Sequence, residues 1–178
     1  MELEIGCGKG LFLTRAAAAH PEVNWFGIDH SSAHLRRAID RALKARLSNA
    51  LFSKARAEDL LGGWIPEGSL RAVHILYPDP WPKKRHHKRR LLGLERGTET
   101  MRHLSRVIQP GGWLSVATDH SGYAEVIGPV CDASPDFERS ESIYSQTVLT
   151  DPEEPLTEFE RKYRLEGRPR HLFTWRRR

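Results

Sequence analysis

Residues 2–10 read Glu-Leu-Glu-Ile-Gly-Cys-Gly-Lys-Gly, a short strand pattern that runs directly into three glycines at alternate positions. Glycines let the backbone turn tightly and approach a ligand without a Cβ in the way, and the start of the next helix adds free N–H donors. The dinucleotide-binding pattern G-x-G-x-x-G would need a glycine where the chain has Leu11. The stretch therefore predicts a strand, a ligand-binding loop of spacing E-x-G-x-G-x-G and a helix. A glycine turn used only for packing is the alternative.

Short apolar runs alternate with helix-period stretches along the rest of the chain. Strands are predicted at Glu2–Ile5, Val23–Ile28, Leu51–Lys54, Arg71–Tyr77, Trp113–Thr118, Phe137–Ile143 and His171–Arg176. Strands that alternate with helices favour an α/β fold with a doubly wound, mostly parallel sheet. Ligands of such sheets bind beyond the carboxyl ends of the strands. Asp29, an acidic residue suited to hold ribose hydroxyls, closes the second strand at such an end.

Helical periodicity marks the segments between the strands. Helices are predicted at Leu11–Ala19 and Gly122–Cys131, and another is marked by Leu94, Thr98, Met101, Leu104 and Ile108. The helix after the second strand has the apolar face Leu35, Ala38, Ile39, Ala42 and Leu43, with Ser31 or Ser32 as its N-cap. Pro110-Gly111-Gly112 predicts a turn before the fifth strand.

Length and composition bound the class of protein. The chain has 178 residues and is 39% hydrophobic, which suits one domain with a sizeable core and excludes a disordered chain. No stretch approaches the roughly 18 apolar residues of a membrane span, and the first residues carry no secretory signal. Cys7 and Cys131 cannot form a disulfide framework and are expected to be reduced thiols. We therefore expect a cytoplasmic protein without a membrane partner.

The positive charge of the chain is concentrated in one segment. The net charge is +5, and Lys83–Arg90 alone contributes six cations, so that the remainder would be −1. Arg176, Arg177 and Arg178 add a second basic group at the C-terminus. A localised basic patch favours a polyanionic partner such as nucleic acid. A solvated surface loop is the alternative.

Residues 77–83, Tyr-Pro-Asp-Pro-Trp-Pro-Lys, follow the fourth strand and precede the basic run. The flanking prolines restrict the backbone around Asp79, whose carboxylate can accept hydrogen bonds from a base edge. Trp81 offers a face on which a base can stack. A turn carboxylate and a packing aromatic are the alternatives for these two residues. His86 and His87 lack a cysteine or carboxylate at ligand spacing, so no metal site is expected.

Five motifs, residues 4–10, 77–83, 85–90, 117–119 and 157–162, together resemble the bacterial tRNA (guanine-N7-)-methyltransferases. The second and third motifs are highly specific to that family, and the resemblance covers almost the whole chain. It implies the class I methyltransferase fold, a Rossmann-like seven-stranded sheet with a C-terminal antiparallel strand pair. It also implies a cytoplasmic enzyme that uses S-adenosylmethionine to methylate a guanine in the variable loop of tRNA.

Residue roles follow from the resemblance and the glycine loop, position by position. The cofactor is expected to be bound by Glu4, Gly6, Gly8, Asp29, Arg56 and Asp79. Asp79 is also implied to be the catalytic residue. The substrate is expected to be bound by Lys83, Asp119, Thr157, Glu158, Phe159 and Glu160. The implied RNA-contacting residues are Arg85, His86, His87, Lys88, Arg89 and Arg90.

The chain departs from the family pattern in three places. Relatives usually have an acidic or amide residue where this chain has Arg56, so the cofactor contact there is expected from the backbone or from Glu58 or Asp59. Tyr163 stands where a small residue usually follows Lys162. Relatives also carry an extension before the first strand, whereas this sequence begins within that strand. We therefore expect residues 1–178 to form a single methyltransferase domain that lacks this extension. Truncation or a misassigned start would explain its absence.

The chemistry of guanine N7 defines what the site must supply. N7 has a free lone pair, so the reaction needs alignment rather than a strong general base. Carboxylates that accept hydrogen bonds from N1–H and the exocyclic amine would stabilise the positive charge that develops on the purine. We expect Asp79 in this role, with Asp119 and Glu160 assisting. The alternatives are Asp119 as a helix N-cap, Glu160 as a surface charge, and Thr157 as either a cap or a phosphate ligand.

Two other functions remain open at this level. One is a methyltransferase for another acceptor, such as a different RNA base or a protein amine. The other is a non-catalytic RNA-binding protein on a methyltransferase fold, against which the glycine loop and Asp29 argue. The expected assembly is a monomer or a homodimer.

Overall fold

A seven-stranded sheet with the strand order β3-β2-β1-β4-β5-β7-β6 forms the centre of the molecule. The computed structural model describes residues 1–144, 149 and 155–178. The strands are β1 (Glu2–Ile5), β2 (Trp25–Asp29), β3 (Ala50–Lys54), β4 (Leu70–Leu76), β5 (Ile108–Thr118), β6 (Phe137–Ser140) and β7 (His171–Arg177). The first five pair in parallel, whereas β7 runs antiparallel to both β5 and β6. The predicted fold class, with its antiparallel C-terminal strand pair, is confirmed.

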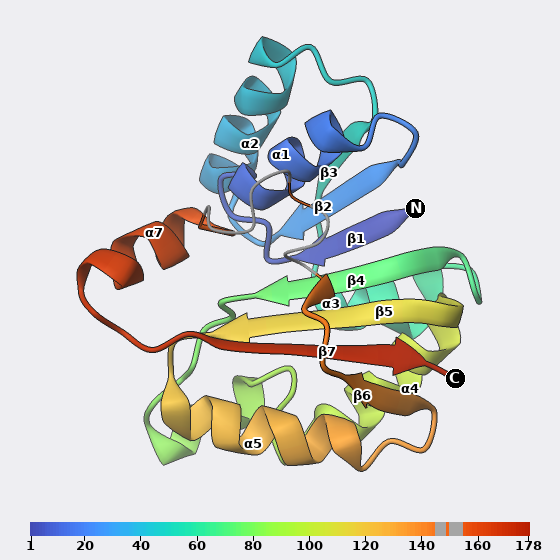
Figure 1. The fold of residues 1–178 in the computed structure, drawn as a ribbon, viewed down its shortest axis with the longest axis vertical. Coiled ribbons are helices and arrows are strands. Elements are labelled where there is room, and N and C mark those ends of the chain that lie inside the picture. The colour runs from blue at the N-terminus through green and yellow to red at the C-terminus, as the bar shows by residue number, and fades with distance from the viewer. Residues whose placement is uncertain (145–148, 150–154) are drawn as a thin grey trace.

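Helices cover both faces of the sheet (Figure 1). They are α1 (Leu11–Ala19), α2 (Ser32–Lys44), α3 (Ala57–Asp59), η1 (Leu60–Trp64), η2 (Lys84–Arg89), α4 (Gly97–Val107), α5 (Ser121–Asp132) and α7 (Glu158–Leu165). One buried cluster joins α1 to the face of the sheet that carries Trp25 and Ala117. A second and larger cluster joins η1, α4 and α5 to the face that carries Ile28 and Val116. No helix of the described residues is long and apolar enough to span a bilayer.

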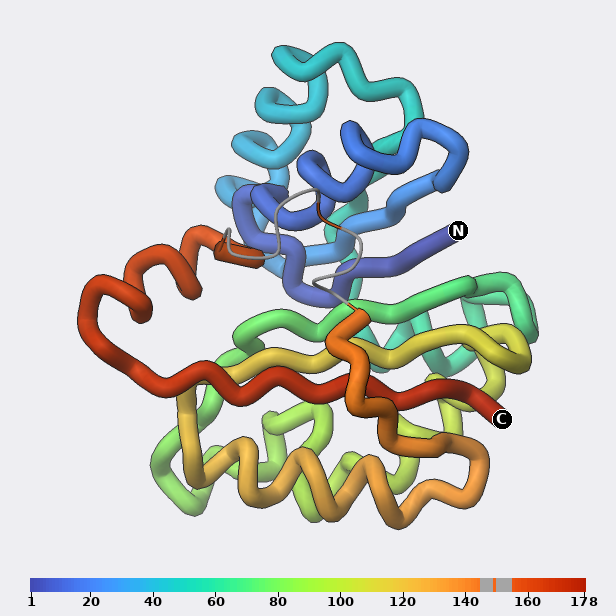
Figure 2. Tube along the Cα trace, viewed as in Figure 1, coloured from blue at the N-terminus to red at the C-terminus, as the bar shows by residue number. Residues whose placement is uncertain are grey.

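The parallel strands all end at the edge of the sheet where α7 lies, and both chain ends lie at the opposite edge (Figure 2). Residues that follow β1, β2, β4 and β5 therefore meet at one edge, although they are far apart in the sequence. This edge is where a ligand site of a doubly wound sheet is expected.

Most predicted elements are confirmed with shifts of a few residues, and three elements differ from the prediction. Residues 110–112, predicted as a turn, lie within β5, where the register jumps from the pair Leu70–Ile108 to the pair Ala72–Trp113. The turn signal therefore marks a bulge inside a strand. The strand predicted at Phe137–Ile143 is shorter in the structure, where β6 ends at Ser140. The helix α4 begins at Gly97, and Leu94 before it is 80% exposed.

The helix α2 begins at the predicted N-cap, because the side chain of Ser31 accepts a hydrogen bond from the backbone N–H of His34. Its predicted apolar face is too wide. Leu35 and Ala38 are buried, whereas Ile39 and Leu43 are 41% and 68% exposed. The helix packs at an outer part of the sheet, beside the edge strand β3, so only a narrow stripe is covered.

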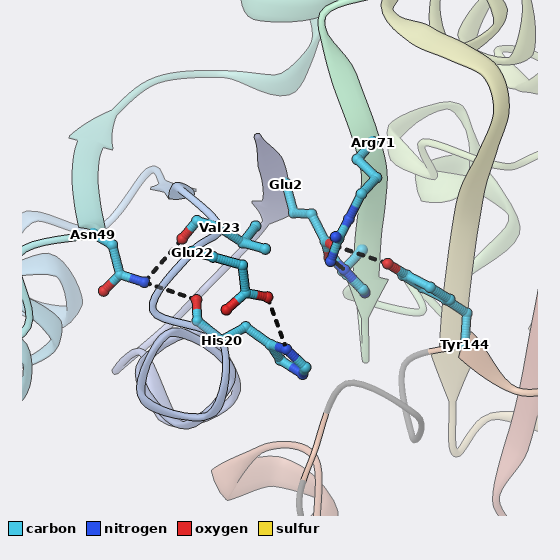
Figure 3. A network of polar contacts seen from close by, with 8 residues as sticks. Glu2, His20, Glu22, Val23, Asn49, Arg71 and Tyr144 are labelled. Carbon is cyan, nitrogen blue, oxygen red and sulfur yellow. Dashed lines mark hydrogen bonds and ion pairs between the residues drawn. The ribbon is translucent and has the colours of Figure 1, made fainter.

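A buried carboxylate ties the first strand to β4 and to the segment after β6 (Figure 3). Glu2 accepts hydrogen bonds from Arg71 at 2.7 Å and from the hydroxyl of Tyr144 at 2.8 Å, and its other oxygen lies 2.8 Å from His74. Burial acts to raise the pKa of Glu2, but the hydrogen bond and charge of His74, together with Tyr144 and Arg71, lower this pKa to about 2. The charged carboxylate is thus stabilised where β1 begins.

Replacement of Glu2 by Gln is expected to lower the free energy of unfolding at pH 7 by about 2 kcal/mol, because charge-assisted hydrogen bonds are lost in a buried place. The folded-state pKa of about 2 lies below the ordinary value of 4.5. The contribution of Glu2 is therefore complete above pH 4.5 and is lost as the pH falls toward 2. Denaturant titrations of both proteins at pH 7, 4 and 3 measure the difference.

Glu22→Gln is the matched control, because Glu22 is 65% exposed and pairs with His20 at 3.3 Å (Figure 3). Surface pairs of this kind contribute about 0–1 kcal/mol. A difference between wild type and Glu2→Gln that does not change with pH would contradict the assignment of the stabilising charge to Glu2.

Candidate active site

A cavity of about 290 Å³ lies at the carboxyl edge of the sheet. Segments that follow all five parallel strands line it. It brings together seven of the predicted site residues, namely Gly6, Gly8, Asp29, Asp79, Arg89, Asp119 and Phe159. A second cavity of about 180 Å³ adjoins it at the glycine loop and is lined by Glu4 and Phe159, among others. We refer to the two cavities together as the crevice.

The glycine loop between β1 and α1 owes its shape to backbone conformations that favour glycine. Gly6, Gly8 and Gly10 have φ angles of +77°, +53° and +72°. A Cβ on Gly10 would come within 2.8 Å of the Cβ of Ala38, so glycine is also needed there for the close approach of α2. These observations contradict the alternative that packing alone explains all three glycines, because a Cβ on Gly6 would meet nothing within 4 Å.

Asp29 holds this loop in place. Its carboxylate accepts a hydrogen bond from the backbone N–H of Gly8 at 2.9 Å and another from the N–H of Ser31 at 2.7 Å. The residue is 7% exposed and lines the crevice. A carboxylate fixed by two backbone donors still has lone pairs that can accept hydroxyl protons of a ligand.

Glu4 lies almost fully buried at the floor of the second cavity. Its Oε2 atom has no hydrogen-bond partner among the described residues. The pKa of Glu4 is raised to about 8, chiefly by burial. A backbone hydrogen bond from Leu13 acts to lower this pKa, and the charge of Asp29 acts to raise it. An unpaired buried carboxyl oxygen beside a cavity fits a ligand that carries a positive charge or a donor group.

Asp79 lies exposed at the mouth of the crevice, in a loop with unusual backbone geometry. Tyr77 and Trp81 have φ angles of +54° and +42°, in a region that non-glycine residues rarely adopt. Such strain persists only where surrounding contacts fix it, and it clusters at functional sites. Arg90 supplies one of these contacts, because its Nε donates to the carbonyl of Pro80 at 2.7 Å.

The structure separates Arg90 from the other residues of the predicted RNA-contacting segment. Arg90 is only 4% exposed, and its guanidinium lies 4.7 Å from the ring of Tyr123. Its side chain therefore supports the Asp79 loop from inside and cannot lie along an external polyanion. Lys83, Arg85, Lys88 and Arg89 are exposed, and His86 and His87 are half-buried. We call residues 83–89 the basic segment; the guanidinium of Arg89 lies 4.6 Å from the ring of Trp81 and lines the crevice.

Asp119 follows β5 and accepts a hydrogen bond from Arg168 at 2.9 Å. The N-cap of α5 is His120, whose side chain accepts from the N–H of Tyr123, so the N-cap alternative for Asp119 is wrong. The Asp119 side chain is 10% exposed and lines the crevice beside Asp79. Its charge therefore faces the cavity while Arg168 balances part of it.

The segment 157–160 divides between structural and cavity-lining residues. Thr157 caps α7, because its hydroxyl accepts from the N–H of Glu160 at 3.1 Å. Glu160 is fully buried and pairs with Arg164 and Arg170 at 2.7 Å each. The alternative of Glu160 as a surface charge is wrong, and the residue is also absent from the lining of the crevice. Thr157, Glu158 and Phe159 all line the second cavity, and Glu158 also pairs with Arg41 at 2.7 Å.

Arg56 lies outside the crevice, on the rim of a neighbouring cavity of about 500 Å³ that also includes Asp29 and Asp79. Its side chain is 71% exposed and lies 3.7 Å from Glu58. Ala57 and Glu58 do line the crevice, whereas Asp59 does not. Glu58 accepts a hydrogen bond from Arg96 at 2.6 Å. Of the two carboxylates weighed for this position, the structure therefore brings only Glu58 to the crevice.

Tyr163 is a cavity residue that the sequence analysis named only as a departure from the family pattern. Its ring stacks near Phe159, with centroids 6.3 Å apart, and the guanidinium of Arg168 lies 4.4 Å from its centre. Phe159 and Tyr163 are four residues apart in α7 and so share one helix face. This spacing was the available signal that both rings face the crevice.

No group of three or more His, Cys, Asp or Glu side chains that could hold a metal ion occurs in residues 1–144, 149 and 155–178. The chemistry that the crevice offers comes from carboxylates, aromatic rings and backbone donors.

The sheet order and the crevice define a class I methyltransferase fold. The antibiotic-resistance methyltransferase Kmr has a similar structure, with a TM-score of 0.62 and 20% identity, over 99% of this chain and 86% of that one. TrmN from Thermus thermophilus matches with a TM-score of 0.65 and 18% identity, over 99% of this chain and 43% of that one. These likenesses support the fold.

Sequence comparison defines the family. A family model described as "Putative methyltransferase" (Methyltransf_4) matches residues 1–172, and the chain belongs to this family. The tRNA (guanine-N(7)-)-methyltransferase of Alkalilimnicola ehrlichii is 39% identical over 90% of this chain and 65% of its own length. The protein of the same name from Syntrophotalea carbinolica is 35% identical over 98% of this chain and 73% of its own length. The chain thus spans slightly less than two thirds of the first of these relatives.

Replacement of Glu4 by Gln tests whether the unpaired carboxyl is neutral in the folded protein. Its folded-state pKa of about 8 lies above the ordinary value of 4.5. The stability that comes from proton binding at Glu4 is therefore complete below pH 4.5 and is lost as the pH rises through 8. We expect the Tm of wild type to fall relative to that of Glu4→Gln between pH 5 and pH 8, as measured by calorimetry.

The exposed Glu67 provides the control, since Glu67→Gln should follow wild type at every pH. Parallel Tm profiles for wild type and Glu4→Gln would show that Glu4 is already charged at neutral pH in the folded protein, against the assignment.

Proposed function

We propose that this chain transfers a methyl group from S-adenosylmethionine to N7 of a guanine in the variable loop of tRNA. The observation that carries the proposal is the position of Asp79. Its loop lines one crevice with the glycine loop and Asp29 and continues directly into the basic segment. The names of the relatives from A. ehrlichii and S. carbinolica point to the same activity. The whole chain would act as one methyltransferase domain, in the cytoplasm, where tRNA is found.

The glycine-loop side of the crevice fits the cofactor. Glu4 offers an unpaired buried oxygen to the positively charged end of such a molecule, and Asp29 offers lone pairs to ribose hydroxyls. Ala57 and Glu58, rather than the side chain of Arg56, would lie beside the adenine base of the cofactor. When bound, S-adenosylmethionine supplies an electrophilic methyl group on a sulfonium sulfur. A solved methyltransferase of the same fold, PKMT2 from Rickettsia typhi, is in complex with AdoHcy (TM-score 0.51, 18% identity, over 65% of this chain and 20% of that one).

The opposite side of the crevice fits a purine. Asp79 and Asp119 would accept hydrogen bonds from N1–H and the exocyclic amine of guanine, which adenine cannot offer in that arrangement. Phe159 and Tyr163 supply aromatic faces for the base. Because N7 already has a free lone pair, these residues need only align the base and stabilise the positive charge that develops on it.

The basic segment would hold the RNA backbone. Lys83, Arg85, Lys88 and Arg89 are exposed directly after the Asp79 loop. Such side chains neutralise phosphates and supply much of the affinity for nucleic acid. The guanidinium of Arg89 against Trp81 also links this segment to the loop that would hold the base.

The proposal is tested by incubating the full chain with unmodified tRNA and methyl-labelled S-adenosylmethionine, followed by nucleoside analysis. We expect N7-methylguanosine as the product, which makes the RNA cleavable by reduction and aniline. Asp79→Asn should lower the rate about 100-fold or more, the scale on which one electrostatic stabiliser acts in a transition state. Asp40→Asn, at an exposed position of α2, should keep the wild-type rate.

Each alternative function gives a different result in the same assay. A different methylated nucleoside would indicate another RNA base as the acceptor. tRNA binding without any saturable heat on titration with S-adenosylmethionine would indicate a non-catalytic RNA-binding protein. Full activity of Asp79→Asn would remove Asp79 from the proposed role.

A further inference from the structure

Trp64 is an exposed tryptophan that the proposed function does not use. It is 73% exposed, whereas Trp25 and Trp175 are fully buried. It ends the π-helical segment η1, directly after Gly62 and Gly63. Short π-helical segments are uncommon and occur frequently at functional sites. The position of this side chain therefore calls for a ligand or a partner.

Trp64 lines a cavity of about 250 Å³ together with His30, Lys54, Arg56 and Asp59. Within the described part of the chain no ion pair joins Lys54, and Arg56 has only the 3.7 Å contact with Glu58. The side chain of His30 is 84% exposed. An aromatic face with two weakly balanced cations beside it suits an anion that carries a ring.

This cavity is continuous with the surface around Asp79. His30, Ala55 and Arg56 line both it and the neighbouring cavity of about 500 Å³, which also includes Asp79, Trp81 and Arg89. A path of basic and aromatic residues thus leads from the basic segment, past the mouth of the crevice, to Trp64.

We infer that Trp64, Lys54 and Arg56 form a second RNA contact, which binds an unpaired nucleotide that flanks the methylated guanine. The base would stack on Trp64, and Lys54 and Arg56 would contact the adjacent phosphates. Stacking on an aromatic ring combined with cations is how single-stranded nucleic acid is bound without sequence readout. The inference rests on the proposed function, since it assigns RNA as the ligand.

The charge of the surface disfavours a protein as the occupant. Protein–protein interfaces are depleted in lysine and aspartate, and here Lys54 and Asp59 lie beside the exposed ring of Trp64.

The test measures the affinity of the full chain for unmodified tRNA by filter binding over a range of salt concentrations. Trp64→Ala is expected to weaken binding about tenfold at fixed salt, from the loss of one stacked base, and Trp64→Phe should retain most of the affinity. The double variant Lys54→Gln with Arg56→Gln should reduce the slope of log K against log salt by about 1–2, the value expected for one or two lost phosphate contacts.

Matched controls lie at the far end of α2. Leu43 is 68% exposed, so Leu43→Ala removes a similarly exposed apolar side chain. Lys44→Gln with Arg46→Gln removes the same number of exposed charges. Both controls should bind tRNA as wild type does. The affinity of Trp64→Ala for S-adenosylmethionine, measured by calorimetry, should also equal that of wild type.

The possible outcomes separate this inference from the proposed function. Wild-type tRNA affinity and salt slope in the Trp64 and Lys54/Arg56 variants would overturn the inference while leaving methylation by wild type intact. Failure of wild type to methylate tRNA would contradict the proposed function instead. A change from dimer to monomer in sedimentation of Trp64→Ala, with unchanged tRNA affinity, would assign the surface to a second copy of the chain and overturn the RNA contact.

Discussion

The hydrogen bond from the backbone N–H of Gly8 to the carboxylate of Asp29 is the contact on which the site depends. It joins the loop after β1 to the end of β2, at 2.9 Å and almost out of contact with water. The second oxygen of Asp29 is held by Ser31 at the start of α2. One carboxylate therefore fixes the loop, the strand end and the following helix relative to each other.

The charges of the site are arranged in two zones. Carboxylates face the crevice, with Glu4 and Asp29 on the glycine-loop side and Asp79 and Asp119 on the other. Cations are concentrated outside it in the basic segment, although Arg89 of that segment, Lys9 and Lys162 also line the crevice. Carboxylates within a cavity can select donor groups and stabilise a developing positive charge, whereas exposed cations attract phosphates over a longer range. The two zones together suit a reaction on a nucleic-acid base, in which the ring enters the cavity and the backbone stays outside.

Several residues were predicted well because their sequence pattern leaves few physical choices. The alternate glycines after an apolar strand require a tight loop, and Asp29 at the end of the next strand must meet that loop once the two strands pair in parallel. The serine cap of α2 and the bounds of α1 follow from local hydrogen bonding and periodicity in the same way. Other residues could not be assigned from type and position alone. Arg90 closes a run of cations but is buried beneath the Asp79 loop, and Glu160 belongs to a motif that carried the family resemblance but balances two arginines in the interior.

The order of strands and helices, the glycine loop, the Asp79 loop and the location of the positive charge could all be predicted from the amino-acid sequence alone. These features are local, since they depend on periodicity, on the φ angles that glycine and proline permit and on the charge of neighbouring residues. The folded structure was needed to show which charged side chains face the crevice, which of them neutralise each other in the interior, and that Trp64 shares an open surface with Arg56. Those outcomes depend on contacts between segments far apart in the chain, such as Asp119 with Arg168, and such contacts exist only after the sheet has formed.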